Sequence, residues 1–161
     1  MKRSLILVAV AVLGVPAAAQ GGQVTRMVDD DGRAAIGDCD AARETYREIE
    51  SAIDDSGPRD RVLVCPGRYA AFDIHGESKD GLTVQAIERW RAIIYGIAPA
   101  EVVRGSFVTV REAEGVTIAG FHIRPGGVTC GYNAIFFLGA TGVVRDNRIA
   151  PAATDPGCSS N

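Results

Sequence analysis

Three segments that each begin at a glycine repeat one short pattern of apolar residues, and this repetition limits the fold of the chain most strongly. They read Gly-Leu-Thr-Val-Gln-Ala-Ile (81–87), Gly-Val-Thr-Ile-Ala-Gly-Phe-His-Ile (115–123) and Gly-Val-Val-Arg-Asp-Asn-Arg-Ile (142–149). Alignment stacks Val84, Ile118 and Val144 in one column, Ile87, Phe121 and Asn147 in a second, and Ile123 and Ile149 in a third. Repeats at intervals of 34 residues (84 to 118) and 26 residues (118 to 144) are typical of solenoids, whose units bury apolar faces on their neighbours.

Short runs rich in β-branched residues, each closed by Gly, Asp or Pro, fill the chain after residue 60. They are Val62–Cys65, Leu82–Ile87, Ala92–Tyr95, Phe107–Val110, Val116–Ile123, Ala134–Leu138 and Val143–Ile149. Runs of this length between turn residues predict an all-β fold, either a sandwich, a barrel or a solenoid. The repeated columns favour the solenoid.

Residues 40–55 carry a helical pattern. The apolar residues of this segment recur at steps of four, three and four, and they are Ala42, Tyr46, Ile49 and Ile53. Asp40 can cap the first turn, and the sequence Asp-Ser-Gly-Pro at 55–58 ends the pattern. We therefore expect an amphipathic helix over 40–55 that lies on an apolar surface.

The first nineteen residues have the composition of a secretory signal peptide. Lys2 and Arg3 precede an uncharged apolar run over residues 5–15, and Ala17 and Ala19 supply small side chains before a cleavage point. The run is short for a membrane span of about 20 residues, which disfavours the alternative of an uncleaved anchor. We expect a secreted protein, extracellular or periplasmic, with no stable membrane anchor after cleavage.

The charge balance limits the partners of the chain. It holds 17 Lys and Arg against 20 Asp and Glu, a net charge of −3. This becomes 15 against 20, or −5, once Lys2 and Arg3 leave with the signal peptide. An acidic chain is a poor ligand for the phosphates of nucleic acid, so we expect no nucleic-acid partner.

The cysteines form an even set of four: Cys39, Cys65, Cys130 and Cys158. In an oxidising compartment such a set favours two disulfides. Three pairings are possible, and the order along the chain favours Cys39–Cys65 and Cys130–Cys158. A zinc site is the alternative, but the chain has no Cys-x-x-Cys pair.

Two adjoining segments match the start of a known family. Residues 45–53 (Thr-Tyr-Arg-Glu-Ile-Glu-Ser-Ala-Ile) resemble its N-terminal capping helix, and residues 60–69 (Asp-Arg-Val-Leu-Val-Cys-Pro-Gly-Arg-Tyr) resemble its first coil, which ends in a Pro-Gly-x-Tyr turn. Residues 118–123 and 144–149 resemble its later coil repeats. The family is that of secreted proteins with a right-handed parallel β-helix, the pectate-lyase-like superfold, and the resemblance covers roughly residues 27–149.

The resemblance implies an all-β right-handed parallel β-helix of about four coils with an N-terminal capping α-helix. It divides the chain into a signal peptide (1–19), a lead segment (20–39), the capping helix with the coils (40–149) and a C-terminal loop (150–161). Residues that would point inward in such coils are Val62, Val64, Val84, Ile118 and Val144. Asn147 would continue a tight turn through bonds of its amide to the backbone.

The two ends of such a β-helix would differ. A disulfide between Cys39 and Cys65 would pin the capping helix to the first coil. A loop composition, and no capping pattern, follows the last repeat over residues 150–161. We therefore expect that this end permits self-association.

No catalytic residues can be assigned from the sequence. Lyases of the superfold use acidic calcium ligands, and hydrolases use paired carboxylates. Asp73 is isolated, and the candidates for a calcium or catalytic pair are Glu112 and Glu114, in a segment that reads as a solvated turn. We expect no cofactor, with calcium as the ion to test, and surface positions for His75 and His122.

Three aromatic residues are candidates for contact with polysaccharide: Trp90, Tyr95 and Tyr132. An aromatic ring suits the apolar face of a sugar, although packing under loops is the alternative use of each.

Two functions are compatible with these features. The first is a secreted, non-catalytic module that binds, or is displayed to, polysaccharide or cell-surface material. The second is the N-terminal part of a carbohydrate-active enzyme, a polysaccharide lyase or glycoside hydrolase, whose active site lies in further coils. We favour the first because no catalytic set can be assembled from these residues.

Overall fold

The computed structural model describes residues 22–96, 106–125 and 133–150, and the statements below concern these residues. The elements in chain order are β1 (Thr25–Val28), α1 (Ile49–Asp54), β2 (Arg61–Val64), β3 (Gly67–Tyr69), β4 (Phe72–His75), the 3-10 turn η1 (Glu77–Lys79), β5 (Thr83–Ala86), β6 (Ala92–Gly96), β7 (Ser106–Arg111), β8 (Val116–Ala119), β9 (His122–Pro125), β10 (Asn133–Leu138), β11 (Gly142–Arg145) and β12 (Arg148–Ile149). The prediction of a predominantly β fold is confirmed.

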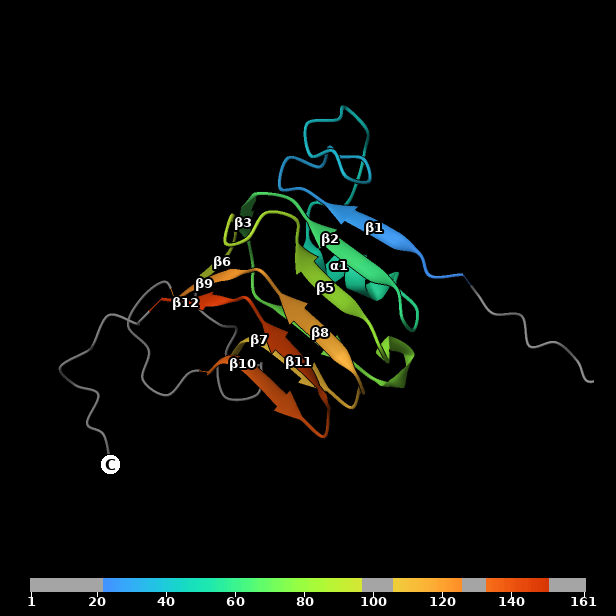
Figure 1. The fold of residues 1–161 in the computed structure, drawn as a ribbon, viewed down its shortest axis with the longest axis vertical. Helices are drawn as coiled ribbons and strands as arrows, with labels where there is room; N and C mark the ends of the chain where they lie inside the picture. The colour runs from blue at the N-terminus through green and yellow to red at the C-terminus, as the bar shows by residue number, and fades with distance from the viewer. Residues whose placement is uncertain (1–21, 97–105, 126–132, 151–161) are drawn as a thin grey trace, which may run out of the picture.

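The strands form three sheets in which neighbouring strands run parallel (Figure 1). Their orders are β1-β2-β5-β8-β11, β3-β6-β9-β12 and β4-β7-β10. From β2 onward the chain visits the five-stranded, the four-stranded and then the three-stranded sheet, and it repeats this order from β5 and again from β8. Each repeat therefore adds one strand to each sheet, beside the strand of the previous repeat.

The strand register confirms two of the three columns predicted from the repeats; the third, of Ile87, Phe121 and Asn147, lies outside the paired strands. Paired strands align Val62, Val84, Ile118 and Val144 in one column, and Ile123 with Ile149 in another. Val62, Val84 and Ile118 are fully buried, but 48% of Val144 is exposed. Val144 thus shares the column of the inward residues but remains exposed, because β11 is the edge strand of its sheet and no described strand covers it.

Two of the predicted strands are each broken by a corner. Gly120 follows β8 and Asp146 follows β11 at the equivalent position of the repeat, and both have a positive φ, 80° and 59° respectively. A positive φ takes the backbone out of the extended conformation. The runs Val116–Ile123 and Val143–Ile149 therefore become two strands each, which belong to different sheets.

Asn147 stabilises the second of these corners. Its side-chain oxygen accepts a hydrogen bond from the Phe121 N–H at 2.9 Å, and its amide nitrogen donates one to the Ile118 carbonyl at 2.9 Å. The side chain thus satisfies backbone groups that the bend leaves without a strand partner. The predicted contact of this amide with the backbone is confirmed.

The helix is shorter than the segment predicted for it. It begins at Ile49, and the N–H of Asp40 instead donates to the Asp38 carboxylate at 3.0 Å, so Asp40 does not cap it. Residues 42–48 lie beside residues 28–34, where the Asp29 N–H donates to the Tyr46 carbonyl at 2.9 Å. These non-local bonds use backbone groups that a longer helix would need, so tertiary pairing overrides the helical periodicity.

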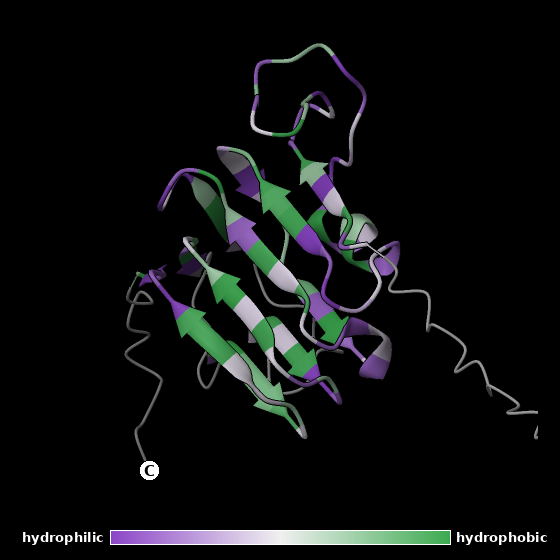
Figure 2. Ribbon diagram, turned by 45° about the vertical axis from the view of Figure 1, so that its right-hand side comes forward, coloured by the Kyte–Doolittle hydropathy of each residue, from purple (hydrophilic) through white to green (hydrophobic). Residues whose placement is uncertain are grey.

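The core lies between α1 and the inward faces of the three sheets. Ile49, Ala52 and Ile53 of α1 are buried, and the helix packs against β1, β2 and β4. Figure 2 shows apolar residues along the strands and hydrophilic residues concentrated in the connections. Because β1 and β4 are edge strands, α1 covers one end of the stacked strands, opposite the end formed by β10, β11 and β12.

Cys39 and Cys65 form a disulfide, with Cα atoms 5.7 Å apart, as the order of the cysteines predicts. Cys65 directly follows β2 and is buried, whereas Cys39 lies in the loop between β1 and α1. The bond therefore ties this loop to the five-stranded sheet. Cys130 and Cys158, and the predicted signal peptide, lie outside the described residues.

Within residues 22–96, 106–125 and 133–150, no helix is long and apolar enough to span a bilayer.

Replacement of both Cys39 and Cys65 by serine should lower the free energy of unfolding by about 2–5 kcal/mol. The bond joins residues separated by 26 positions, so its loss increases the conformational freedom of the unfolded chain. Denaturant unfolding under oxidising conditions measures the difference, and under reducing conditions the variant and the wild type should unfold alike. Equal midpoints under oxidising conditions would contradict a stabilising role.

Lys79 holds the C-terminal end of α1. Its ammonium group donates hydrogen bonds to the carbonyls of Ile53 at 2.8 Å, Asp54 at 2.9 Å and Ser56 at 2.7 Å. Carbonyls in the last turn of a helix have no partner within the helix, and a cation there is also favoured by the helix dipole. This side chain therefore links η1 to the helix that covers the core.

The variant Lys79→Met keeps an apolar side chain of similar length but removes the donor. We expect it to lower the free energy of unfolding by about 1–3 kcal/mol, the range for loss of a hydrogen-bonded charged group. Urea unfolding provides the measurement. Glu77→Gln, a change of an exposed charge in the same turn, is the matched control and should have no effect. Wild-type stability of Lys79→Met would show that these bonds contribute nothing.

Candidate functional site

The outer surface of the four-stranded sheet carries side chains in a regular arrangement. Tyr69, Ile94 and Ile123 are aligned in its register and buried. Side chains alternate along a strand, so the residues directly before and after these three face outward. Parallel pairing places Arg68, Ile93, His122 and Arg148 in one row across β3, β6, β9 and β12, and places Tyr95 beside Arg124 in a second row. We call these six residues the basic face.

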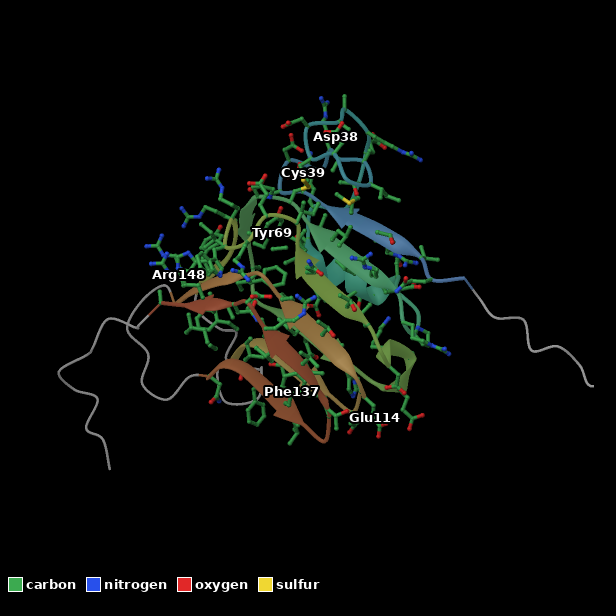
Figure 3. The ribbon with its side chains drawn as sticks, viewed as in Figure 1. Asp38, Cys39, Tyr69, Glu114, Phe137 and Arg148 are labelled. Carbon is green, nitrogen blue, oxygen red and sulfur yellow. A yellow bond between two sulfur atoms is a disulfide. The ribbon has the colours of Figure 1, made fainter. Side chains whose placement is uncertain are left out.

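Three arginines give the basic face its charge. Arg68, Arg124 and Arg148 are exposed, and within the described residues none of them forms an ion pair with a carboxylate. Figure 3 shows Arg148 projecting outward at this side of the molecule, with nitrogen atoms of other side chains beside it. A local excess of positive charge on a chain with net charge −3 attracts anions to this surface.

Tyr95 supports one of these arginines. The guanidinium carbon of Arg68 lies 4.3 Å from the centre of the Tyr95 ring, within the range of a cation–π contact. The backbone N–H of Arg68 donates to the Asp30 carboxylate at 3.0 Å, which also fixes the start of β3. Tyr95, a predicted sugar contact, is 42% exposed. Because its ring contacts the Arg68 guanidinium, it helps to orient a charged group on the basic face.

His122 lies between two arginines of the basic face. Burial lowers the pKa of its imidazole, and the positive charges of Arg148 and Arg124 lower it further. Both effects disfavour the protonated ring.

Trp90, the second predicted sugar contact, lies at a corner before β6. It has a positive φ of 66°, its indole N–H donates to the Asp146 carbonyl at 2.7 Å, and the Arg89 guanidinium carbon lies 5.4 Å from its ring centre. Arg89 also pairs with the Asp146 carboxylate. Trp90 therefore holds the corner between β11 and β12, while its ring remains 42% exposed. Tyr132, the third candidate, lies outside the described residues.

The candidates for a metal or catalytic pair do not form a cluster in the described ranges. The Oε2 atom of Glu112 lies 3.1 Å from the Nε2 atom of His75, and both side chains are exposed. The backbone N–H of Glu114 donates to Asp80 at 2.7 Å. No group of three or more His, Cys, Asp or Glu residues suited to a metal ion occurs among the described residues, so Glu112 and Glu114 gain no further ligand.

A groove of about 490 Å³ lies beside α1, β3 and β4, lined in part by Arg47, Glu48, Glu50, Arg68 and Asp73. Glu50 accepts a hydrogen bond from the Asp73 N–H at 2.8 Å, and burial raises the pKa of the Glu50 carboxyl. The Asp73 carboxylate, which the sequence pairs with no second carboxylate, forms an ion pair with Arg111 of β7.

The carboxylates of Glu50 and Asp73 hold elements of the fold together. Glu50 joins α1 to β4, and the ion pair of Asp73 with Arg111 joins β4 to β7. Sequence spacing could not reveal either contact, because the partners are 23 and 38 residues apart. Asp30 also lines the groove, which therefore has more carboxylates than guanidinium groups and is less suited to an acidic ligand than the basic face.

The arginines of the basic face are the functional candidates that the sequence pattern did not identify. Arg68 belongs to a segment that reads as a turn, Arg124 follows the predicted run Val116–Ile123, and Arg148 is next to last in the run Val143–Ile149. The alternation of side chains along a strand is the sequence signal that could have identified them. Arg68, His122 and Arg148 each directly precede a residue of the column formed by Tyr69, Ile94, Ile123 and Ile149.

Comparisons of the chain with protein-family models, with curated proteins and with solved structures find no match.

Removal of the charge of Arg148 should raise the pKa of His122. In the variant Arg148→Gln one of the two positive neighbours is lost, and protonation of the imidazole becomes easier. Titration of the His122 ring signals by NMR measures the change. Arg148→Lys keeps the charge and should leave the pKa lowered, and an identical pKa of His122 in Arg148→Gln would contradict the proximity of the two side chains.

Proposed function

We propose that the chain is a secreted right-handed parallel β-helix of about four coils, similar to the pectate-lyase-like superfold, with α1 as its N-terminal cap. The fixed order in which the chain visits three parallel sheets supports this fold. The signal-peptide composition of residues 1–19 and the Cys39–Cys65 disulfide support secretion.

We further propose that the protein is a non-catalytic module that binds acidic polysaccharide through the basic face. The observation that carries this function is the row in which Arg68, His122 and Arg148 project from the outer surface of one sheet, with Ile93 between Arg68 and His122. Guanidinium groups form paired hydrogen bonds with carboxylates, which are the charged groups of acidic polysaccharides. Exposed arginines without carboxylate partners in the described chain are available for such bonds.

The double variant Arg68→Ala/Arg148→Ala tests this function. It should weaken binding to immobilised polygalacturonate by about tenfold, because each exposed charge pair contributes up to about 1 kcal/mol. The matched control is Arg33→Ala/Arg43→Ala, which removes two exposed arginines outside the basic face and changes the net charge equally. Neutral dextran is the ligand control and should not bind.

Other results would overturn the proposal. Equal loss of binding in the two double variants would assign the attraction to net charge alone. Failure of the wild type to bind polygalacturonate and alginate would remove the function. Release of unsaturated or reducing products from either polymer would show catalysis and favour the carbohydrate-active enzyme.

A further inference from the structure

We propose that two copies of the chain associate end to end, with the edge strand β11 of one copy paired antiparallel with β11 of the other. The contact lies at the end of the stacked strands formed by β10, β11 and β12 (Figure 1). The partner of this end is a second copy of the same chain, related to the first by a two-fold axis. The association requires no ligand on the basic face.

The apolar interior is open at this end of the fold. Ile118 is fully buried, but 48% of Val144, its neighbour in the same column, is exposed. In the column of the four-stranded sheet Ile123 is fully buried, whereas 55% of Ile149 is exposed. Both exposed side chains belong to inward columns, so a partner that covers them would remove apolar surface from water and stabilise an association.

The backbone at this end can also form hydrogen bonds with a partner. Among the described residues β10, β11 and β12 are each the last strand of a sheet, and they pair on one side only, with β7, β8 and β9 respectively. In a parallel ladder, alternate N–H and C=O groups of such an edge strand point away from its neighbour. The partner therefore has to supply strand edges as well as apolar side chains.

The segment that follows β12 in the sequence is poorly suited by composition to this position. Residues 151–161 contain two prolines and no Val, Ile, Leu, Met or aromatic residue. Proline has no N–H for a strand ladder, and small polar side chains would cover little of Val144 and Ile149. A second copy, in contrast, offers the same free strand edges and the same exposed apolar side chains.

The opposite end of the fold favours a two-fold arrangement. There α1 packs against the edge strands β1 and β4, and its residues Ile49, Ala52 and Ile53 are buried. Head-to-tail stacking would need that end to be open, so two copies can meet only through their uncovered ends. A contact between identical surfaces is isologous and closes at the dimer. The two-fold axis reverses the winding of the second chain, so the facing strands run antiparallel.

The inward and outward faces of β11 determine the register of the contact. Directly opposite residues of paired strands point to the same face of a sheet. Val144 points inward and Val143 outward, so an axis at Val144 places the two inward valines opposite each other. An axis at Val143 would instead place Val144 opposite Gly142 and would bury less apolar surface.

The size of the end is sufficient for a weak dimer. The contact is formed by the last described repeat, residues 133–149. At about 30 Å² for each interface residue, two such ends would bury on the order of 1,000 Å², the lower limit for a specific interface. We therefore expect a dissociation constant in the micromolar range.

Sedimentation of the secreted protein at about 1–100 μM should show an equilibrium of monomer and dimer. The variant Val144→Lys sets two ammonium groups opposite each other at the axis and should weaken dimerisation by more than about tenfold. The matched control is Ile36→Lys, which changes an exposed apolar residue in the loop between β1 and α1 and should leave dimerisation unchanged. Circular dichroism shows whether each variant is folded.

Two cysteine variants test the register without an added charge, and they decide the matter if Val144→Lys fails to fold. In the proposed register the Cα atoms of the two residues at position 144 lie about 4.5–5.5 Å apart, within the range of a disulfide. The two residues at position 143 are offset diagonally and lie about 8 Å apart, beyond that range. Mild oxidation should therefore cross-link copies of Val144→Cys much faster than copies of Val143→Cys.

Several results would overturn the proposed dimer. These are a wild type that stays monomeric at the highest concentration, unchanged dimerisation of folded Val144→Lys, and an equal loss in Ile36→Lys. Equal cross-linking of the two cysteine variants would overturn the pairing of β11 with itself, and species larger than a dimer would overturn the two-fold arrangement. Binding of polygalacturonate is measured separately with the arginine variants, so its failure would leave the dimer standing.

Discussion

The parallel register between successive repeats is the constraint on which the rest of the structure depends. It places Val62, Val84 and Ile118 directly beside one another in the buried interior. Backbone hydrogen bonds between neighbouring strands form only in such a register, and a slip of one residue would turn every apolar side chain of a strand outward. The core and the hydrogen bonding of the sheets are therefore satisfied by the same alignment.

The same register determines what the surface presents. Because Tyr69, Ile94 and Ile123 are aligned inside the four-stranded sheet, Arg68, Ile93 and His122 must be aligned outside it. The outward row of basic side chains is then a direct consequence of the stacking of the core. The two ends of the stacked strands differ. The helix α1 covers the first strands, whereas 52% of Val143 on the edge strand β11 is exposed.

Local pattern was a good guide where the repeats are regular and a poor one where distant segments meet. The columns through Val84 and Ile118 were predictable because apolar spacing within each repeat is short-range information. The helix is shorter than the predicted span 40–55, because residues 43–46 pair with residues 28–34 through bonds that no local pattern encodes. The strands β3 and β4 were not predicted, since each is short and contains polar residues.

From the residues alone, the sequence predicted the β character and the apolar column through Val84 and Ile118, and it favoured Cys65 among three possible pairings as the partner of Cys39. These features depend on apolar spacing within each repeat or on the order of the cysteines along the chain. The row of Arg68, His122 and Arg148, and the contact of Asp73 with Arg111, became visible only in the folded chain. These residues belong to different repeats joined by connections of unequal length, so their alignment follows from the register of the folded sheets.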